Sequence, residues 1–477
     1  MCNTDSVRPR VSNVRSVLLG AITLVAFWPL CGKPIAAGSS VPQGNIERVL
    51  RQIIDKPEGP LSSEDFAGVT TVIAEGMAIS DLSGIENCGN LVHLRLRANG
   101  ITDISNLSGL SSLKSLDLSF NDIADLSSLR TLIGLEILNV QNNRVRDLTD
   151  LSGLVNLREL RAWGNEIVDL TPVSRLTRLE KLELGENRIT DLAPLSSLTA
   201  LSRLGVSDND ISDIAPLCAL MELHDLVLMY NTISDLAPIA EHTRLGVLVA
   251  NGNPISDLEP LASCPNLRRL FLSGCRIDNV TLLSSLEALV DLDVSANQIP
   301  DIRPIASLPR LTHLLADRNP IVDVSPIAQM GGLTFLQIGP CEISDLGFLS
   351  GTPGLSHLTI YDLRTGELGR LSTLIELESL YLSGEAICDL SPLANLTNVR
   401  ILDIHHTRVS DLHPLMSLTA LWHAGLDNNQ ITDLQPLVAN PGLGQGDFLS
   451  LGGNPLTPEA INVQVSQLRE RGVVVTY

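Results

Sequence analysis

One phrase recurs every 22 residues along most of this chain, and this repetition limits the possible folds more than any other feature. Aligned on Leu91–Asn99, seventeen consecutive units cover residues 69–442 without an insertion, and a shorter eighteenth unit surrounds Leu449–Leu451. A unit of this length cannot bury its hydrophobic face alone, so neighbouring units must stack on one another. We therefore expect one continuous solenoid, although 477 residues would otherwise suggest about three domains.

Each position of the repeat predicts a local structure. The repeat reads L-x-x-L-x-L-x-x-N-x-I-x-D-L-x-P-L-x-x-L-x-x. The alternation of Leu116, Asp117 and Leu118 is typical of a short strand with one buried face. Apolar residues spaced by three, such as Leu126 and Leu129, favour 3₁₀ turns over full α-helices on the returning half of each unit.

The repeat resembles the leucine-rich repeat, and its length and Asp-Leu-x-Pro-Leu segment are similar to the class found in bacterial internalins. The resemblance covers about four-fifths of the chain, residues 69–442. It implies an α/β solenoid, a leucine-rich repeat horseshoe with a parallel β-sheet on the concave side. Short 3₁₀ turns would line the convex side, and caps would close both ends.

Two polar columns of the repeat are expected to support the backbone. An amide such as Asn121 follows each strand, where it can bond to both the N–H and the C=O groups of the turning backbone. An acidic residue such as Asp125 precedes each outer turn and can accept its unpaired N–H groups. A ladder of Ca²⁺ sites is the alternative, but no further oxygen donors recur beside the acids. Leu363 and Glu385 interrupt the amide column, and we expect a local twist or a loosened turn there.

The composition argues against several classes of function. The chain has 33 Lys and Arg residues against 54 Asp and Glu, a formal net charge of −21, which disfavours nucleic acid and a polybasic membrane contact. No C-x-x-C pair or zinc-type His spacing is present, and we expect neither a metal nor a cofactor. Gly-rich phosphate loops and nucleophile motifs are also absent, so we expect no enzyme.

The two ends depart from the repeat. We expect residues 1–38 to be a signal peptide, because arginines precede an uncharged, mostly apolar run, Val17–Cys31, that is too short to span a bilayer. A lipid anchor on Cys31 is the alternative, opposed by the bulky residues before it. Residues 39–68 would form an N-terminal helical cap, and residues 443–477 a terminal repeat with a cap of helix and edge strand. No other segment predicts a membrane span, so the mature protein would be secreted or periplasmic.

Exposed positions on the strands vary between units, and a ligand would bind there. Ring-bearing side chains gather at these positions in the C-terminal half, although only 3% of the residues are aromatic. Rings supply contact area at a low entropy cost, so the cluster is a candidate surface for a protein partner. Its members are His313, Phe335, His357, Tyr361, Tyr381, His405 and His423. A second candidate patch, nearer the N-terminus, consists of Arg95, Arg97, Arg161 and Trp163.

Other interpretations remain open from the sequence. The ring cluster could be an ordinary variable surface, or it could bind a glycan or the cell wall. An intracellular regulatory scaffold, resembling phosphatase-regulatory repeat proteins, is a third alternative, and the signal peptide opposes it. Asp403, His405, His423 and Asp427 could also meet on adjacent units as a loose metal or acid–base cluster. We favour an exported monomer that recognises a protein partner through its concave face.

Overall fold

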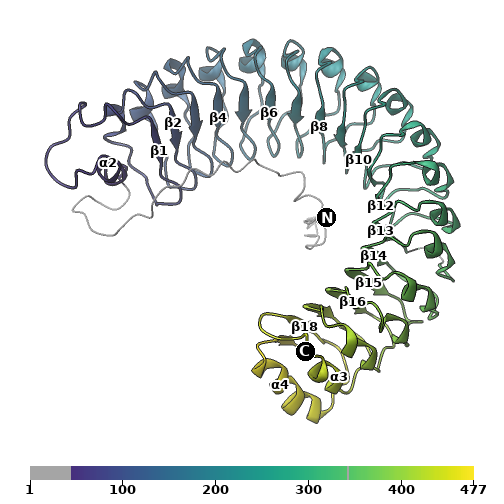
Figure 1. Cartoon of the computed structure of the whole chain (residues 1–477). Helices are drawn as coiled ribbons and strands as arrows, with labels where there is room; N and C mark the ends of the chain where they lie inside the picture. Colours follow the sequence, from purple (N-terminus) through teal and green to yellow (C-terminus); the bar gives the residue numbers. More distant parts are fainter. Residues whose placement is uncertain (1–44, 341–342) are drawn as a thin grey trace, which may run out of the picture. The chain divides into compact units, whose positions relative to one another are not determined.

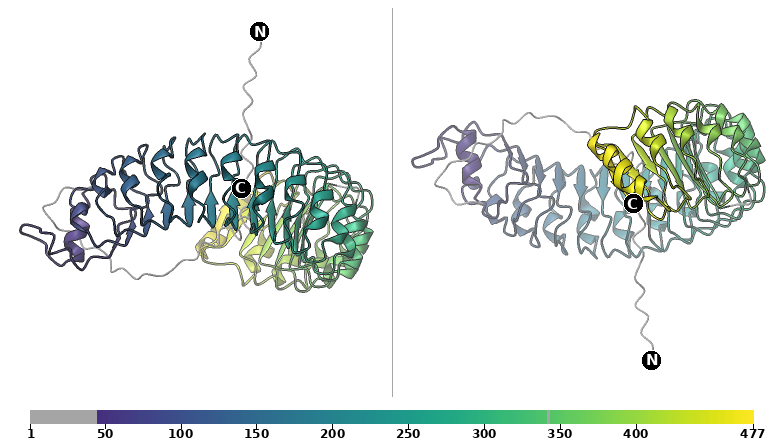
Figure 2. Two further views of the ribbon diagram at one scale, coloured as in Figure 1. Left: turned by 90° about the horizontal axis from the view of Figure 1, so that it is seen from above. Right: turned by 90° about the horizontal axis from the view of Figure 1, so that it is seen from below.

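The computed structural model describes residues 45–340 and 343–477. These residues form a solenoid in which each 22-residue unit is one rung, with its strand on the inner side of the curve and its turn on the outer side (Figure 1). Two further views show the same succession of strands and turns from above and below (Figure 2). The expected signal peptide and Cys31 lie outside the described residues. The predicted leucine-rich repeat solenoid is confirmed.

The strands form one parallel sheet of 19 members, and each strand pairs with the next along the chain. The register follows the repeat, since Leu94 pairs with Leu116 and Leu116 with Leu138. The strands are β1 Thr71–Ile73, β2 His93–Arg95, β3 Ser115–Asp117, β4 Ile137–Asn139, β5 Glu159–Arg161, β6 Lys181–Glu183, β7 Arg203–Gly205, β8 Asp225–Val227, β9 Val247–Val249, β10 Arg269–Phe271, β11 Asp291–Asp293, β12 His313–Leu315, β13 Phe335–Ile338, β14 His357–Ile360, β15 Ser379–Ser383, β16 Ile401–His405, β17 His423–Gly425, β18 Phe448–Ser450 and β19 Val474–Thr476.

Short 3₁₀ helices make the outer side of the rungs, as the spacing of three predicts. In chain order they are η1 Ile85–Asn87, η2 Ser105–Leu107, η3 Ser127–Thr131, η4 Thr149–Leu151, η5 Thr171–Arg175, η6 Ala193–Leu195, η7 Ala215–Ala219, η8 Ala237–Ile239, η9 Glu259–Ser263, η10 Thr281–Ser285, η11 Arg303–Ser307, η12 Ser325–Gln329, η13 Gly347–Gly351, η14 Gly369–Thr373, η15 Ser391–Leu393 and η16 His413–Ser417.

Longer helices lie towards the two ends of the array. Helix α2, Glu47–Ile53, precedes β1, and Ile46 and Leu50 are fully buried there, whereas Ile53 is largely exposed. After the last turn come α3, Gln435–Ala439, a π-helical segment, Ala460–Gln464, and α4, Val465–Glu470. Within residues 45–340 and 343–477, no helix is long and apolar enough to cross a membrane.

The core is a continuous stack of aliphatic side chains. In the rung that starts at Leu113, the residues Leu116, Leu118, Ile123 and Leu129 are all fully buried, and the equivalent positions of the other rungs are similar. Each such side chain contributes roughly 1.5–3 kcal/mol when it leaves water. Because each rung covers the face of its neighbour, the core extends along the whole array.

The amide column forms the predicted ladder behind the strands. Asn165 Nδ2 donates to the carbonyl oxygens of Val140 and Ala162, both at 3.0 Å. Its Oδ1 accepts the N–H of Val145 at 2.9 Å, so one side chain ties two rungs together. Cys275 keeps part of this role, since its thiol donates to the carbonyl of Ala250 at 3.6 Å. The column is therefore structural, because its polar atoms are used by the backbone.

Where the amide column is interrupted, the strands lengthen. Strands β13 to β16 have four or five residues, whereas the other strands have three. Leu363 is buried, and its backbone N–H donates to the carbonyl of Ser383 at 2.7 Å. The strands therefore remain paired where the amides are missing, and the local twist or loosened turn stays a prediction.

The acidic column supports the outer turns as predicted. Asp103 Oδ1 accepts the N–H of Ser105 at 2.8 Å, and Asp191 Oδ1 accepts that of Ala193 at 2.7 Å. Asn279, which interrupts the column, accepts the N–H of Thr281 at 2.9 Å in the same way. Glu367 is the exception, because its own N–H donates to Thr365 Oγ1 at 3.0 Å.

Candidate functional site

Three of the predicted rings lie directly beside one another on the concave face. His313, Phe335 and His357 open β12, β13 and β14 and are register neighbours in the sheet. Their ring centroids are 5.9 and 5.6 Å apart, with interplanar angles of 27° and 22°. We call these three residues the ring column. The 22-residue period brings them together, because equivalent positions of successive rungs sit one strand spacing apart.

Polar contacts fix the two histidines of the ring column. His313 Nδ1 lies 2.9 Å from Asp291 Oδ1 and 2.8 Å from Thr312 Oγ1. His357 Nδ1 lies 2.9 Å from Ser356 Oγ, and burial lowers the pKa of His357. Phe335 stacks with a histidine on each side.

Beside the ring column, two tyrosines and an aspartate form a second group, which we call the tyrosine–carboxylate cluster: Tyr361, Tyr381 and Asp403. Tyr381 and Asp403 are register partners on β15 and β16. Burial raises the pKa of Tyr361, and the nearby carboxylates, Asp317 first, add to that effect. Burial also raises the pKa of Tyr381, with Asp403 contributing. The two phenols therefore keep their protons at neutral pH and can donate hydrogen bonds.

His405 belongs to the same neighbourhood. Its Nδ1 lies 2.7 Å from Asp403 Oδ1, and this hydrogen bond raises the pKa of His405 despite partial burial. Its ring meets that of His406 edge to face at a centroid distance of 5.3 Å. Protonation of His405 would strengthen its contact with Asp403, so the pair is a local ion pair at acidic pH.

His423 stands apart from the ring column because Ser379 and Ile401 occupy the two intervening rungs. It stacks instead on Phe448, with centroids 5.2 Å apart and an interplanar angle of 18°. Phe448 was missed in the sequence because the eighteenth unit is irregular, and Phe448 follows His423 by 25 residues rather than 22. The register of β17 with β18 is what reveals the pair.

The loose acid–base cluster considered from the sequence is divided in two. Asp403 pairs with His405, whereas Asp427 Oδ1 accepts the hydroxyl of Ser450 at 2.7 Å and the N–H of Gly452 at 2.6 Å. In the described part of the chain, no three His, Cys, Asp or Glu side chains are grouped so that they could hold a metal ion.

Comparison with known proteins connects this architecture to a family. The family model for leucine-rich repeats in two copies matches residues 111–153, 155–197 and 243–286. An internalin of Listeria monocytogenes, InlF, is 26% identical, with 80% of this chain and 94% of that chain covered and a TM-score of 0.50. The chain is an internalin-like leucine-rich repeat protein. No curated protein sequence matches it significantly.

Two further structures share the fold of this internalin-like protein. A leucine-rich repeat protein of Leptospira interrogans is 21% identical, with 87% of this chain and 97% of that chain covered and a TM-score of 0.60. The plant peptide hormone receptor RGFR1, in complex with RGF2, is 18% identical, with coverages of 86% and 80% and a TM-score of 0.58. At these identities the likeness concerns the fold.

The second predicted patch of the internalin-like protein is not one surface. Arg95 and Arg97 belong to the rung of β2, and Arg161 and Trp163 to that of β5, so two further strands separate the pairs. Arg97 lies over the ring of Phe120, 4.8 Å from its centroid. Arg161 forms an ion pair with the neighbouring Glu159 on its own strand. The structure therefore divides this prediction into two separate places.

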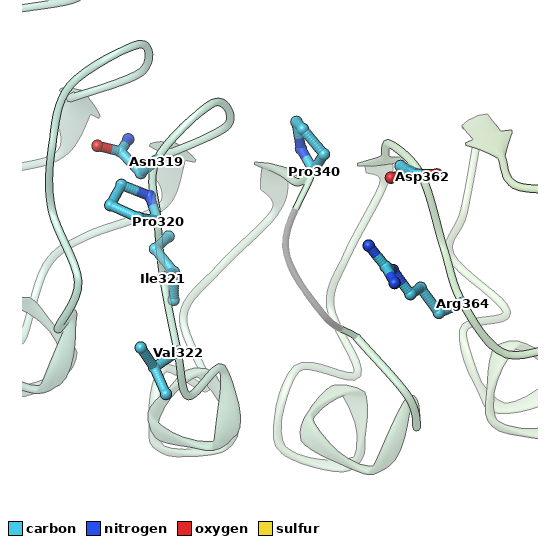
Figure 3. A pocket seen from close by; sticks show the side chains of 7 residues that line it. All are labelled: Asn319, Pro320, Ile321, Val322, Pro340, Asp362 and Arg364. Atoms are coloured by element: carbon cyan, nitrogen blue, oxygen red, sulfur yellow. The ribbon is translucent and has the colours of Figure 1, made fainter.

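A depression of about 360 Å³ lies where the chain has left strands β12, β13 and β14, and none of the ring-column residues lines it (Figure 3). Its lining comes from three rungs and follows the strands: Asn319, Pro320, Ile321, Val322, Pro340, Asp362 and Arg364. The Nδ2 of Asn319 already donates to the carbonyls of Val294 and Ala316. The depression therefore offers mainly apolar walls and no convergent set of reactive side chains.

Proposed function

We propose that this protein is exported and that it binds a protein partner through the concave face of strands β12 to β18. One observation carries the proposal: every rung of this stretch contributes a ring at or next to its strand. These rings are His313, Phe335, His357, Tyr381, His405, His423 and Phe448. Large, rotationally restricted side chains gathered on one face are typical of the centre of a protein interface.

Two further features support the proposal. Solved structures of the same fold include the plant peptide hormone receptor RGFR1 in complex with RGF2 and the ectodomain of the Arabidopsis receptor kinase HAESA in complex with a peptide hormone ligand. Residues 1–38 have the charge and hydropathy pattern of a signal peptide, which supports export. We accordingly propose a binding role without a catalytic step.

The proposal is tested by capture from a cell-envelope extract with three forms of the purified protein. The unaltered protein should capture a partner, and the Phe335→Ala/Tyr361→Ala/Tyr381→Ala variant should not. The matched control removes three rings from the other half, Phe120→Ala/Trp163→Ala/Tyr230→Ala, and should capture normally. The melting temperature of either variant should fall by no more than about 5 °C, because the substituted rings are half-buried or exposed and none belongs to the core.

The nature of the partner is tested in the same experiment. Capture that disappears after protease treatment of the extract, and survives periodate oxidation of its glycans, supports a protein partner. The opposite pattern would identify a glycan. Capture that is equally strong with the Phe335→Ala/Tyr361→Ala/Tyr381→Ala variant would contradict binding at this face.

A further inference from the structure

The concave face carries a different balance of charge in its two halves. We compare the three outward-facing positions of each rung, which are the two outer residues of a three-residue strand and the second residue after it. From β1 to β10 these positions hold six cations, Arg95, Arg97, Arg161, Lys181, Arg203 and Arg269, against five acids, Glu75, Asp117, Glu159, Glu183 and Asp225. From β11 to β18 they hold five acids and neither Lys nor Arg: Asp291, Asp293, Asp317, Asp403 and Asp427.

In the first half, the charges neutralise one another within the face. Arg203 Nε lies 2.5 Å from Glu183 Oε1, and its Nη1 lies 4.0 Å from Asp225 Oδ2. Lys181 lies 3.7 Å from Glu159, which also pairs with Arg161. A charged ligand would have to displace these internal pairs, so this half offers little net attraction to a cation or an anion.

In the second half, Asp291 pairs with Arg269 across the boundary between the halves, with Nε 2.9 Å from Oδ2, whereas Asp403 and Asp427 have neutral or titratable partners. Asp317 is only 4% exposed, its Oδ1 accepts Gln337 Nε2 at 2.8 Å, and its Oδ2 lies 3.7 Å from the Nε of the cationic Arg318. Asp427 accepts a hydroxyl and a backbone N–H. Asp403 has His405, which carries a charge only when it is protonated. Neutral donors orient a carboxylate but leave its negative charge in place.

These carboxylates run alongside the rings. Asp317 and Asp403 lie four rungs apart, roughly 19 Å at the usual strand spacing, and Asp427 follows one rung later. Tyr361 follows β14, so its rung lies between those of Asp317 and Asp403. An extended peptide of about seven residues covers this distance. Its apolar side chains would meet the rings while its cationic side chains reach the carboxylates.

Resting on the proposed function, we propose that the partner presents an extended basic segment, with Arg or Lys alternating with apolar residues, to the face of β12 to β18. The charge complementarity is local, because the other half of the same face has already paired its charges. Cationic groups on the ligand would donate charge-assisted hydrogen bonds to Asp403 and Asp427 and would be attracted by the charge of the buried Asp317, whereas an acidic ligand would be repelled.

The test uses fluorescence anisotropy with synthetic peptides. The probe is a ten-residue peptide of alternating Arg and Leu, and the comparison peptide alternates Glu and Leu. The unaltered protein should bind the Arg–Leu peptide, and raising the salt from 50 to 500 mM should weaken binding by more than tenfold, whereas the Glu–Leu peptide should not bind. The variant Asp317→Asn/Asp403→Asn/Asp427→Asn should bind the Arg–Leu peptide about tenfold more weakly.

The matched control removes the same number of charges from the other half, Asp117→Asn/Glu183→Gln/Asp225→Asn, and should change the affinity by less than about twofold. Equal weakening by both triple variants would overturn the inference, because it would show attraction to the net charge alone. No binding of the Arg–Leu peptide would also overturn it. If Phe335→Ala/Tyr361→Ala/Tyr381→Ala nevertheless lost the envelope partner, the proposed function would stand and only the basic segment would be rejected.

Discussion

The first and second halves of this solenoid use the same 22-residue unit for different purposes. Between β2 and β10 the amide ladder is nearly continuous and the concave charges pair internally. Between β13 and β16 amides are missing, the strands are longer, and the concave face carries rings and carboxylates. Longer strand pairing therefore occurs in the same rungs in which the amides of the repeat are replaced. The rings of the concave face lie in these rungs as well.

The largest expected difference between the halves concerns the column behind the strands. Asn165→Ala should lower the free energy of unfolding by about 3–5 kcal/mol, because it leaves several buried backbone groups without partners. Thr407→Ala should cost only about 1–2 kcal/mol, since Thr407 is bonded to Asn429 and to the N–H of Val409 alone. Urea unfolding of both variants measures the difference, and equal losses would show that the two halves rely on the column alike.

A second contrast concerns histidines with opposite surroundings. His242 is fully buried in the first half, and burial lowers its pKa. Below about pH 6.5, His242 is protonated in the unfolded chain but stays neutral in the folded chain. The free energy of unfolding therefore falls as the pH falls, by at most about 1.4 kcal/mol per pH unit. His242→Leu should remove this slope in urea unfolding between pH 7 and pH 5.

His405 is the matched comparison in the second half. Its pKa is raised by Asp403, so its contribution is present below about pH 6.5 and is lost as the pH rises through its folded-state pKa. His405→Leu should therefore leave the acid loss of stability in place. A His242→Leu variant with the same pH dependence as the unaltered protein would show that this buried ring is not its source.

The smallest expected difference concerns the outer turns. Asp191→Ala removes an acceptor of the Ala193 N–H and should cost about 1 kcal/mol. Glu367→Ala should have a smaller effect, because Thr365 Oγ1 accepts the Glu367 backbone N–H and alanine keeps that N–H. Thermal unfolding of the two variants measures the two losses of stability. Equal losses for Glu367→Ala and Asp191→Ala would mean that both acids support their turns.

Much of the fold follows from the repeat itself. The period predicts the register, and the register predicts that His313, Phe335 and His357 become neighbours. The polarity of the Asn and Asp columns likewise predicts which backbone groups they satisfy. These features depend only on which residues occupy equivalent positions.

Other features depend on contacts that periodicity does not describe. The lengthened strands arise because backbone groups near Leu363 pair across the sheet. The sequence shows only that an amide is missing at this position. The pairing of His423 with Phe448 depends on an irregular last unit. Arg95 and Arg161 lie on β2 and β5, so similar chemistry at exposed positions does not by itself make one patch.

Hydroxyl-radical footprinting of the protein with and without its captured partner is the most direct test of binding at the second half of the concave face. Side-chain oxidation is the suitable readout, since strand amides are already protected by pairing. Phe335 and Tyr381 should become protected when the partner is added, while Trp163 and Phe120 should react as before. Binding at this half of the face would be contradicted if Trp163 and Phe120 became protected instead. It would also be contradicted if the oxidation of Phe335 and Tyr381 were unchanged in the complex.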